Sequence, residues 1–234
     1  MCSPEQKASD VLADPFLKDF DQIPVRRRTN VVGVLERSAM PFGTVRESML
    51  PLDDSLLVSA DQPITKFVAL LSRRPYRLVL VGTEINGIVT RSDIAKPPVR
   101  LLAFTLVSHL ETAITEVIRK HFPIDDTWLK HLDRDRQKRL SGRMKSRRAQ
   151  NLVLPMIDLA DLSDKRRVLT RICGLDSVAE SELAEIEELR NAVAHSRDYA
   201  RTDSELNTVI NRISKIHGWI KRMPELAAKI QSAS

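Results

Sequence analysis

The stretch NGIVTRSDIAKPPVRLLAFTLVSHL, residues 86–110, contains the change of pattern that decides the fold. Before Pro97 and Pro98, short runs rich in Val and Ile alternate with polar turns, which is typical of strands. After this pair, apolar residues recur every three or four positions, which predicts helices. The sequence therefore predicts a multidomain α+β protein, with an α/β module over residues 1–96 and an all-α bundle over residues 97–234.

Five helices are expected in the second part, because the helical pattern is interrupted only by short turns. The predicted helices cover residues 98–121, 126–148, 152–171, 177–199 and 203–231. Pro98 suits the first turn of a helix, where a missing N–H costs nothing. The pairs Asp125-Asp126 and Thr202-Asp203 are expected to cap the helices that follow them.

The first part contains an internal repeat with an offset of 54 residues. VRRRTNVVGVLERSA at 25–39 aligns with VLVGTEINGIVTRSD at 79–93, with identical Val, Thr, Gly, Arg and Ser positions. Each copy reads as a strand, a turn, a strand and the start of a helix. We therefore expect two similar modules packed together, a degenerate one over about 20–43 and a better one over about 44–96.

Residues 56–96 resemble a CBS domain, the module named after cystathionine β-synthase. The segment has the order β-α-β-β-α and ends in the G-h-x-[ST]-x-x-D signature of that family, here GIVTRSD at 87–93. In the family, the Thr and Asp of this signature hold the ribose and phosphate of an adenosine nucleotide. The resemblance therefore implies that Thr90 and Asp93 bind AMP, ADP or ATP as a regulator.

The first copy departs from this signature. It has Glu36 and Ala39 at the positions of Thr90 and Asp93, and its first strand and helix look shortened. We therefore expect at most one nucleotide site per chain. The alternative is a ligand-free module used only for dimerisation, because a fold does not imply a function.

The positive charge of the chain is concentrated in one segment. The net charge is +6, yet residues 130–148 alone carry nine Lys or Arg against two Asp. Such a segment is expected to attract a polyanion, and RNA is the expected partner. The candidate RNA-binding residues are Arg143, Lys145, Arg147 and Arg148. The alternative is an ordinary solvated helix face.

The predicted helix 177–199 separates apolar from polar residues. An apolar stripe with the spacing i, i+3, i+7 is formed by Ile186, Leu189 and Val193. Three polar residues with the spacing i, i+4, i+8 lie on another face, namely Glu187, Asn191 and His195. Because successive residues turn by about 100°, the polar face points largely away from the core. Arg190 is within reach of Glu187, three residues before it.

The segment from Arg190-Asn191 to His195 resembles the R-N-x-x-x-H signature of HEPN domains, the higher eukaryote and prokaryote nucleotide-binding family. The bundle over 98–232 is the expected setting for this signature. The resemblance implies a metal-independent endoribonuclease whose two signature helices meet across a homodimer. The 2′-hydroxyl of the RNA would attack the neighbouring phosphate and leave a 2′,3′-cyclic phosphate.

The residue types in this signature suit that reaction. The imidazole of His195 titrates near neutrality and can take or give a proton. Arg190 offers a permanently charged fork to the phosphate in the transition state. Asn191 could fix the imidazole or bind a phosphate oxygen, and Glu187 could orient Arg190. The alternative is a surface helix with no catalytic role.

The cysteine content, the start of the chain and its apolar runs bear on metal-binding, secreted and membrane classes of protein. Cys2 and Cys173 are far apart, and no His, Asp or Glu cluster has metal-ligand spacing, so no metal and no catalytic cofactor is expected. The start of the chain lacks the pattern of a secretory signal, and the apolar run 101–107 is too short to cross a bilayer. We expect a cytoplasmic protein with no membrane contact.

Two functions remain open. The first is a nucleotide-regulated ribonuclease, which in HEPN families often belongs to stress or defence systems and pairs with an antitoxin or regulatory protein. The second is a non-catalytic module that senses a nucleotide and binds RNA or protein.

Overall fold

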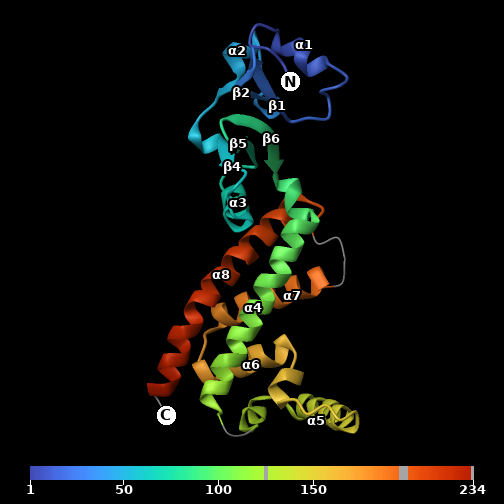
Figure 1. The fold of residues 1–234 in the computed structure, drawn as a ribbon, viewed down its shortest axis with the longest axis vertical. Coiled ribbons are helices and arrows are strands. Elements are labelled where there is room, and N and C mark those ends of the chain that lie inside the picture. The colour runs from blue at the N-terminus through green and yellow to red at the C-terminus, as the bar shows by residue number, and fades with distance from the viewer. Residues whose placement is uncertain (124–125, 195–199, 233–234) are drawn as a thin grey trace. The chain divides into compact units, whose positions relative to one another are not determined.

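The structure is a computed structural model that describes residues 1–123, 126–194 and 200–232 (Figure 1). The chain divides into two compact units, Met1–Thr90 and Arg91–Ser234. The described residues form a mixed α+β protein in which strands belong to the first unit and long helices to the second. The sequence placed the boundary after residue 96, whereas residues 91–96 belong to the helical unit in the structure.

In the described part of the first unit, the strands form two three-stranded sheets with the orders β1-β2-β3 and β4-β5-β6. The strands are β1 Gln22–Arg27, β2 Asn30–Glu36, β3 Leu50–Pro51, β4 Leu57–Ser59, β5 Tyr76–Val81 and β6 Glu84–Thr90. The short helices of this unit are α1 Ala8–Ala13, η1 Arg37–Ala39, α2 Val45–Ser48, η2 Asp54–Leu56 and α3 Ile64–Leu71. Apolar side chains such as Ile23, Leu35 and Leu78 are buried between these elements.

The repeat predicted from the sequence is confirmed by the strand register. β1 pairs antiparallel with β2 starting from Gln22 opposite Glu36, and β5 pairs antiparallel with β6 starting from Tyr76 opposite Thr90. Every residue pair of the first hairpin has its counterpart 54 residues later, and the register irregularity recurs at the same offset. The two copies are therefore alike in backbone pairing as well as in sequence.

The first copy extends further towards the N-terminus than residues 20–43. Cys2 forms a parallel bridge with Val25 of β1, as Val58 of β4 pairs in parallel with Val79 of β5. Helix α1 lies between the bridge and β1 in the sequence, as α3 lies between β4 and β5. The first strand and helix of the degenerate copy are thus shortened to one bridging residue and a six-residue helix.

The second unit is helical. Its elements are η3 Arg91–Ala95, α4 Pro97–His121, η4 Thr127–His131, α5 Arg134–Ala149, η5 Met156–Leu159, α6 Leu162–Cys173, α7 Ser177–Ala194 and α8 Asp203–Ser232. Helices α4 and α8 run alongside each other, and α6 and α7 also pack against α4 (Figure 1). The cap predicted at Thr202 is confirmed, since its hydroxyl accepts the Glu205 N–H while the Glu205 carboxylate accepts the Thr202 N–H.

Two of the predicted helices are wrong in extent. The segment 126–148 is not one helix, because the Asp133 side chain accepts the N–H of Arg136 and starts a new helix there. The predicted helix 152–171 begins at Leu162, where Asp161 and Asp164 form a capping box. Pro155, which has no N–H to donate, lies in the irregular stretch before it.

Helix α4 is the central helix of this unit. Among the described helices it is the one with the length and apolar composition to cross a membrane. Its buried side chains are Val99, Ala103, Val107, Leu110, Ile114, Thr115, Val117 and Ile118. Because such burial is typical of the core helix in a soluble bundle, the structure is compatible with a soluble protein.

Candidate functional site

Helix α7 presents two residues of the predicted catalytic signature on its accessible side. The stripe predicted to face the core is confirmed, because Ile186, Leu189 and Val193 are at most 4% exposed. Asn191 is exposed and Arg190 is partly buried. The Arg190 Nη1 donates to the Asn191 Oδ1 at 3.3 Å. Arginine and amide groups are thus neighbours on a surface that a ligand can reach.

The Glu187 carboxylate has a different partner from the one that the sequence suggested. Its Oε2 accepts a hydrogen bond from the Nε of Arg166 on α6 at 3.1 Å. The same guanidinium also reaches Glu180, at 3.4 Å. Glu187 therefore ties α7 to α6, and the orientation of Arg190 by Glu187 stays a prediction.

His195, the predicted acid and base, lies outside the described residues, which resume at Ala200. The end of α7 that precedes it is held by α4. The carbonyl of Val193 accepts two hydrogen bonds from Arg100, from Nε at 3.0 Å and from Nη2 at 2.7 Å. An arginine at the C-terminal end of a helix satisfies a carbonyl that has no partner within the helix. The last turn of α7 is thereby fixed to the core helix of the unit.

The basic helix α5 has two faces with different roles. On the face toward α6, three arginines pair with carboxylates at the start of that helix: Arg136 with Asp164, Arg139 with Asp164 and Asp161, and Arg143 with Asp161. The Asp164 carboxylate is fully buried. Part of the basic segment therefore holds the bundle together instead of facing a partner.

The four predicted RNA-binding residues are divided between these roles. Arg143 is engaged within the helical unit, since it donates to the Leu159 carbonyl at 3.0 Å and to the Asp161 carboxylate at 2.9 Å, although its side chain is 41% exposed. Lys145, Arg147 and Arg148 are exposed, and the described residues give their side chains no hydrogen-bond or ion-pair partner. These three remain available to an anion.

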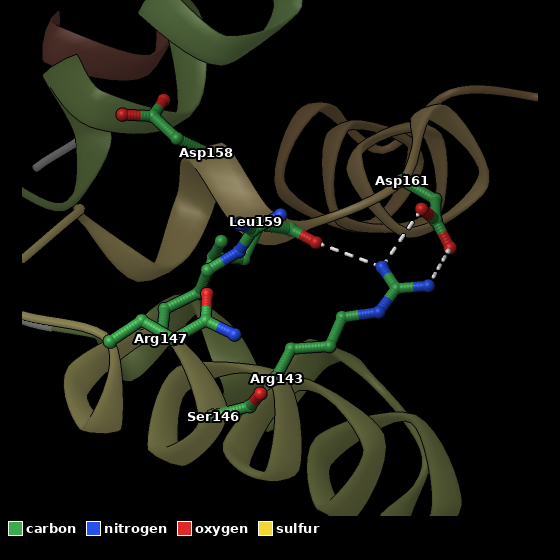
Figure 2. Close-up of a pocket in the computed structure, with 7 residues that line it drawn as sticks. Arg143, Ser146, Arg147, Asp158, Leu159 and Asp161 are labelled. Atoms are coloured by element: carbon green, nitrogen blue, oxygen red, sulfur yellow. Dashed lines mark hydrogen bonds and ion pairs between the residues drawn. The ribbon is translucent and has the colours of Figure 1, made fainter. Parts of the chain in front are cut away.

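A pocket of ≈ 560 Å³ lies between the last turns of α5 and the segment that leads into α6. Figure 2 shows Arg143 spanning it from α5 to Leu159 and Asp161 on the opposite wall. The lining residues are Arg143, Ser146, Arg147, Gln150, Asp158, Leu159 and Asp161. The sequence did not single out this pocket, because its two walls are separated by a stretch without helical periodicity.

The Asp161 carboxylate on the wall of this pocket is held by arginines of α5. Burial alone would raise its pKa, but the hydrogen bond from Arg143 and the charges of Arg143, Arg139 and Arg190 together lower it. Asp161 is therefore ionised at neutral pH.

The predicted nucleotide-binding residues belong to different units, Thr90 to the first and Asp93 to the second. Thr90 is the last residue of β6, in register with Tyr76. Asp93 lies in η3, and its Oδ1 pairs with the Nζ of Lys96 at 2.5 Å. A ligand that binds Asp93 must therefore compete with Lys96 or use its positive charge.

In the first copy, Glu36 lies at the position equivalent to Thr90, and its carboxylate is engaged in a hydrogen bond within the strand unit. The Oε1 of Glu36 accepts from the hydroxyl of Tyr76 at 2.6 Å. Burial, together with this hydrogen bond, raises the pKa of Tyr76 strongly, so the phenol stays protonated and keeps donating. This contact joins the two copies and gives Glu36 a structural role.

No protein-family model and no curated protein matches the chain. The described His, Cys, Asp and Glu residues form no group of three or more suited to a metal ion. The CBS and HEPN resemblances therefore rest on the quoted motifs, and the metal independence of the reaction stays a prediction.

Proposed function

We propose that the protein is a metal-independent endoribonuclease whose site is built from Arg190 and Asn191 of α7 together with His195, which follows this helix in the sequence. The observation that carries this proposal is the Arg190–Asn191 pair on the accessible side of a helix with a buried core stripe. A guanidinium beside an amide offers several donors to a phosphodiester. In the proposed reaction, His195 moves the protons while Arg190 stabilises the charge that develops on the phosphate.

The active unit is proposed to be a homodimer. A single imidazole must first accept the 2′-hydroxyl proton and then supply a proton to the leaving 5′-oxygen. Two signature helices would provide one histidine for each task. Sedimentation of the cleaving species measures this directly, and full activity in a monomer argues against a shared site.

The nucleotide regulation is a separate part of the proposal. It is supported by the GIVTRSD signature, in which Thr90 supplies a hydroxyl and Asp93 a carboxylate. We expect AMP, ADP or ATP to bind in calorimetry and Asp93→Ala to abolish the heat. If no adenosine nucleotide gives heat in the wild-type protein, the strand unit is a scaffold for dimerisation.

Incubation of the purified protein with total RNA in EDTA tests the proposed activity. We expect cleavage products with 2′,3′-cyclic phosphate ends, and we expect Arg190→Ala to lose this cleavage. Arg212→Ala is a matched control, because Arg212 on the neighbouring helix α8 pairs with exposed Glu188 at 2.6 Å. RNA binding without any cleavage would favour the non-catalytic regulatory module instead.

A further inference from the structure

The pocket between α5 and the start of α6 is charged in a way that favours an anion. Of its two carboxylates, Asp158 pairs with Arg119 of α4 at 2.5 Å and Asp161 pairs with Arg143. Each negative charge in the lining is thus matched by an arginine. Arg147 is left as a lining cation that no described carboxylate neutralises.

Neutral hydrogen-bonding groups stand next to this cation. Ser146 lies in the last turn of α5 and Gln150 is the residue that follows this helix, and their side chains make no hydrogen bond within the described part of the chain. At the C-terminal end of α5, the Arg147 carbonyl accepts the N–H groups of Gln150 and Leu152, and the Arg148 carbonyl accepts the N–H of Asn151. These two carbonyls therefore already have donors.

The size and surroundings of the pocket indicate which anion fits. Its ≈ 560 Å³ lies within the range of about 300–1,000 Å³ that is usual for small-molecule sites. Lys145 and Arg148 are exposed residues of the same helix α5 and do not line the pocket. A longer polyanion that enters the pocket could therefore also contact them.

We propose that this pocket holds one nucleotide of the RNA chain. Its phosphate would bind Arg147, and Ser146 and Gln150 would give additional contacts. This inference rests on the proposed ribonuclease function and assigns it a substrate subsite. Arg143 forms the wall of this subsite, and its hydrogen bonds to Leu159 and Asp161 keep the two sides of the pocket together (Figure 2).

A comparison of adjacent arginines tests the subsite. Arg147 and Arg148 are both exposed and carry the same charge, but only Arg147 lines the pocket. The probe is a fluorescein-labelled 2′-O-methyl oligoribonucleotide, which cannot be cleaved through its 2′-oxygen, and binding is followed by fluorescence anisotropy. We expect Arg147→Ala to weaken binding about tenfold and Arg148→Ala less than about threefold, at one fixed salt concentration. Equal losses, or no loss in Arg147→Ala, would overturn the proposal.

A second pair of variants tests whether filling the pocket weakens binding when the charge of the protein is unchanged. Ser146→Trp places a large side chain in the lining, whereas Ala149→Trp does so on an exposed position outside it. We expect only Ser146→Trp to weaken binding, and wild-type affinity in this variant would contradict a pocket-bound nucleotide. Thermal unfolding checks that both variants remain folded.

The outcomes separate the subsite from the cleavage reaction. If the wild-type protein binds the probe through Arg147 but cuts no RNA, the subsite stands and the proposed catalysis fails. If the wild-type protein cuts RNA but Arg147→Ala and Ser146→Trp bind the probe with wild-type affinity, the proposed catalysis stands and the subsite fails.

Discussion

The carboxylate of Asp164 is the buried anchor that attaches the basic helix α5 to the bundle. It is fully buried, it accepts a hydrogen bond from Arg136, and it lies 3.3 Å from Arg139. It also closes the capping box of α6 through the N–H of Asp161. Asp164→Ala therefore removes the shared partner of two arginines and one helix cap in a single change.

The expected cost can be estimated from burial. Removing one partner of a buried ion pair destabilises a protein by roughly 3–5 kcal/mol. The Arg136 and Arg139 side chains keep 22% and 44% exposure and can recover some hydration, which places the cost at the lower end. We expect Asp164→Ala to reduce the free energy of unfolding by about 3 kcal/mol. With a urea slope of about 2 kcal/mol/M, the midpoint should fall by about 1.5 M.

Asp158→Ala is the matched control, because Asp158 also pairs with an arginine on a neighbouring helix. Its pair with Arg119 is solvated, with side chains 37% and 48% exposed, and should contribute less than about 1 kcal/mol. Fluorescence reports the helical unit specifically, since both tryptophans, Trp128 and Trp219, are buried there. An Asp164→Ala midpoint no lower than that of Asp158→Ala would refute the anchoring role.

Two further predictions concern one residue in each unit. Burial, together with neighbouring positive charges, lowers the pKa of His131 below 6.5, so the unfolded chain takes up this proton before the folded one does. Unfolding free energies measured by tryptophan fluorescence should therefore fall as the pH drops through 6.5, and His131→Gln should make this fall smaller. In the strand unit, a Cβ at Gly33 would lie 2.5 Å from the Leu50 carbonyl oxygen, whereas a Cβ at Gly87 would lie 3.7 Å from its nearest neighbour. Thermal unfolding should show Gly33→Ala to be destabilising by about 1–3 kcal/mol and Gly87→Ala to be nearly neutral, although the repeat makes the two positions equivalent.

The features that the sequence predicted best depend on local periodicity. The register of the two hairpins follows from alternating residues and an offset of 54, because a slip by one residue would exchange the faces of each strand. The buried stripe of α7 follows in the same way from helical spacing. Each hairpin and the stripe of α7 are formed by residues that are close together in the chain.

The features that the sequence missed depend on single residues or distant partners. The bridge at Cys2 is one residue long and has no periodicity to detect. The break at Asp133 follows from one side chain that caps a new helix inside a stretch of helical composition. The partner of Glu187, Arg166, lies 21 positions away in the sequence, so spacing within the helix suggested Arg190 instead.

The four predicted RNA-binding residues also differ in how far the sequence could predict their surroundings. Lys145, Arg147 and Arg148 are exposed, which agrees with an outward-facing role, whereas Arg143 is engaged by Asp161, the N-cap residue of α6. Charge counting along the chain cannot separate these roles, because it does not include the carboxylates that folding brings to one face. The capping-box pattern at Asp161 was the available signal, since it marks where those carboxylates collect.

The central claim is that His195 carries the chemistry of RNA cleavage, and one comparison of two histidines tests it most directly. A synthetic RNA is incubated in EDTA with the wild-type protein, with His195→Ala and with His217→Ala. His217 is the matched control, because it has the same spacing from an arginine but its Nδ1 lies 3.0 Å from the Ile213 carbonyl within α8. The account predicts 2′,3′-cyclic phosphate products from the wild-type protein and from His217→Ala, and none from His195→Ala. Cleavage that persists in His195→Ala, or that EDTA abolishes in the wild-type protein, would contradict it.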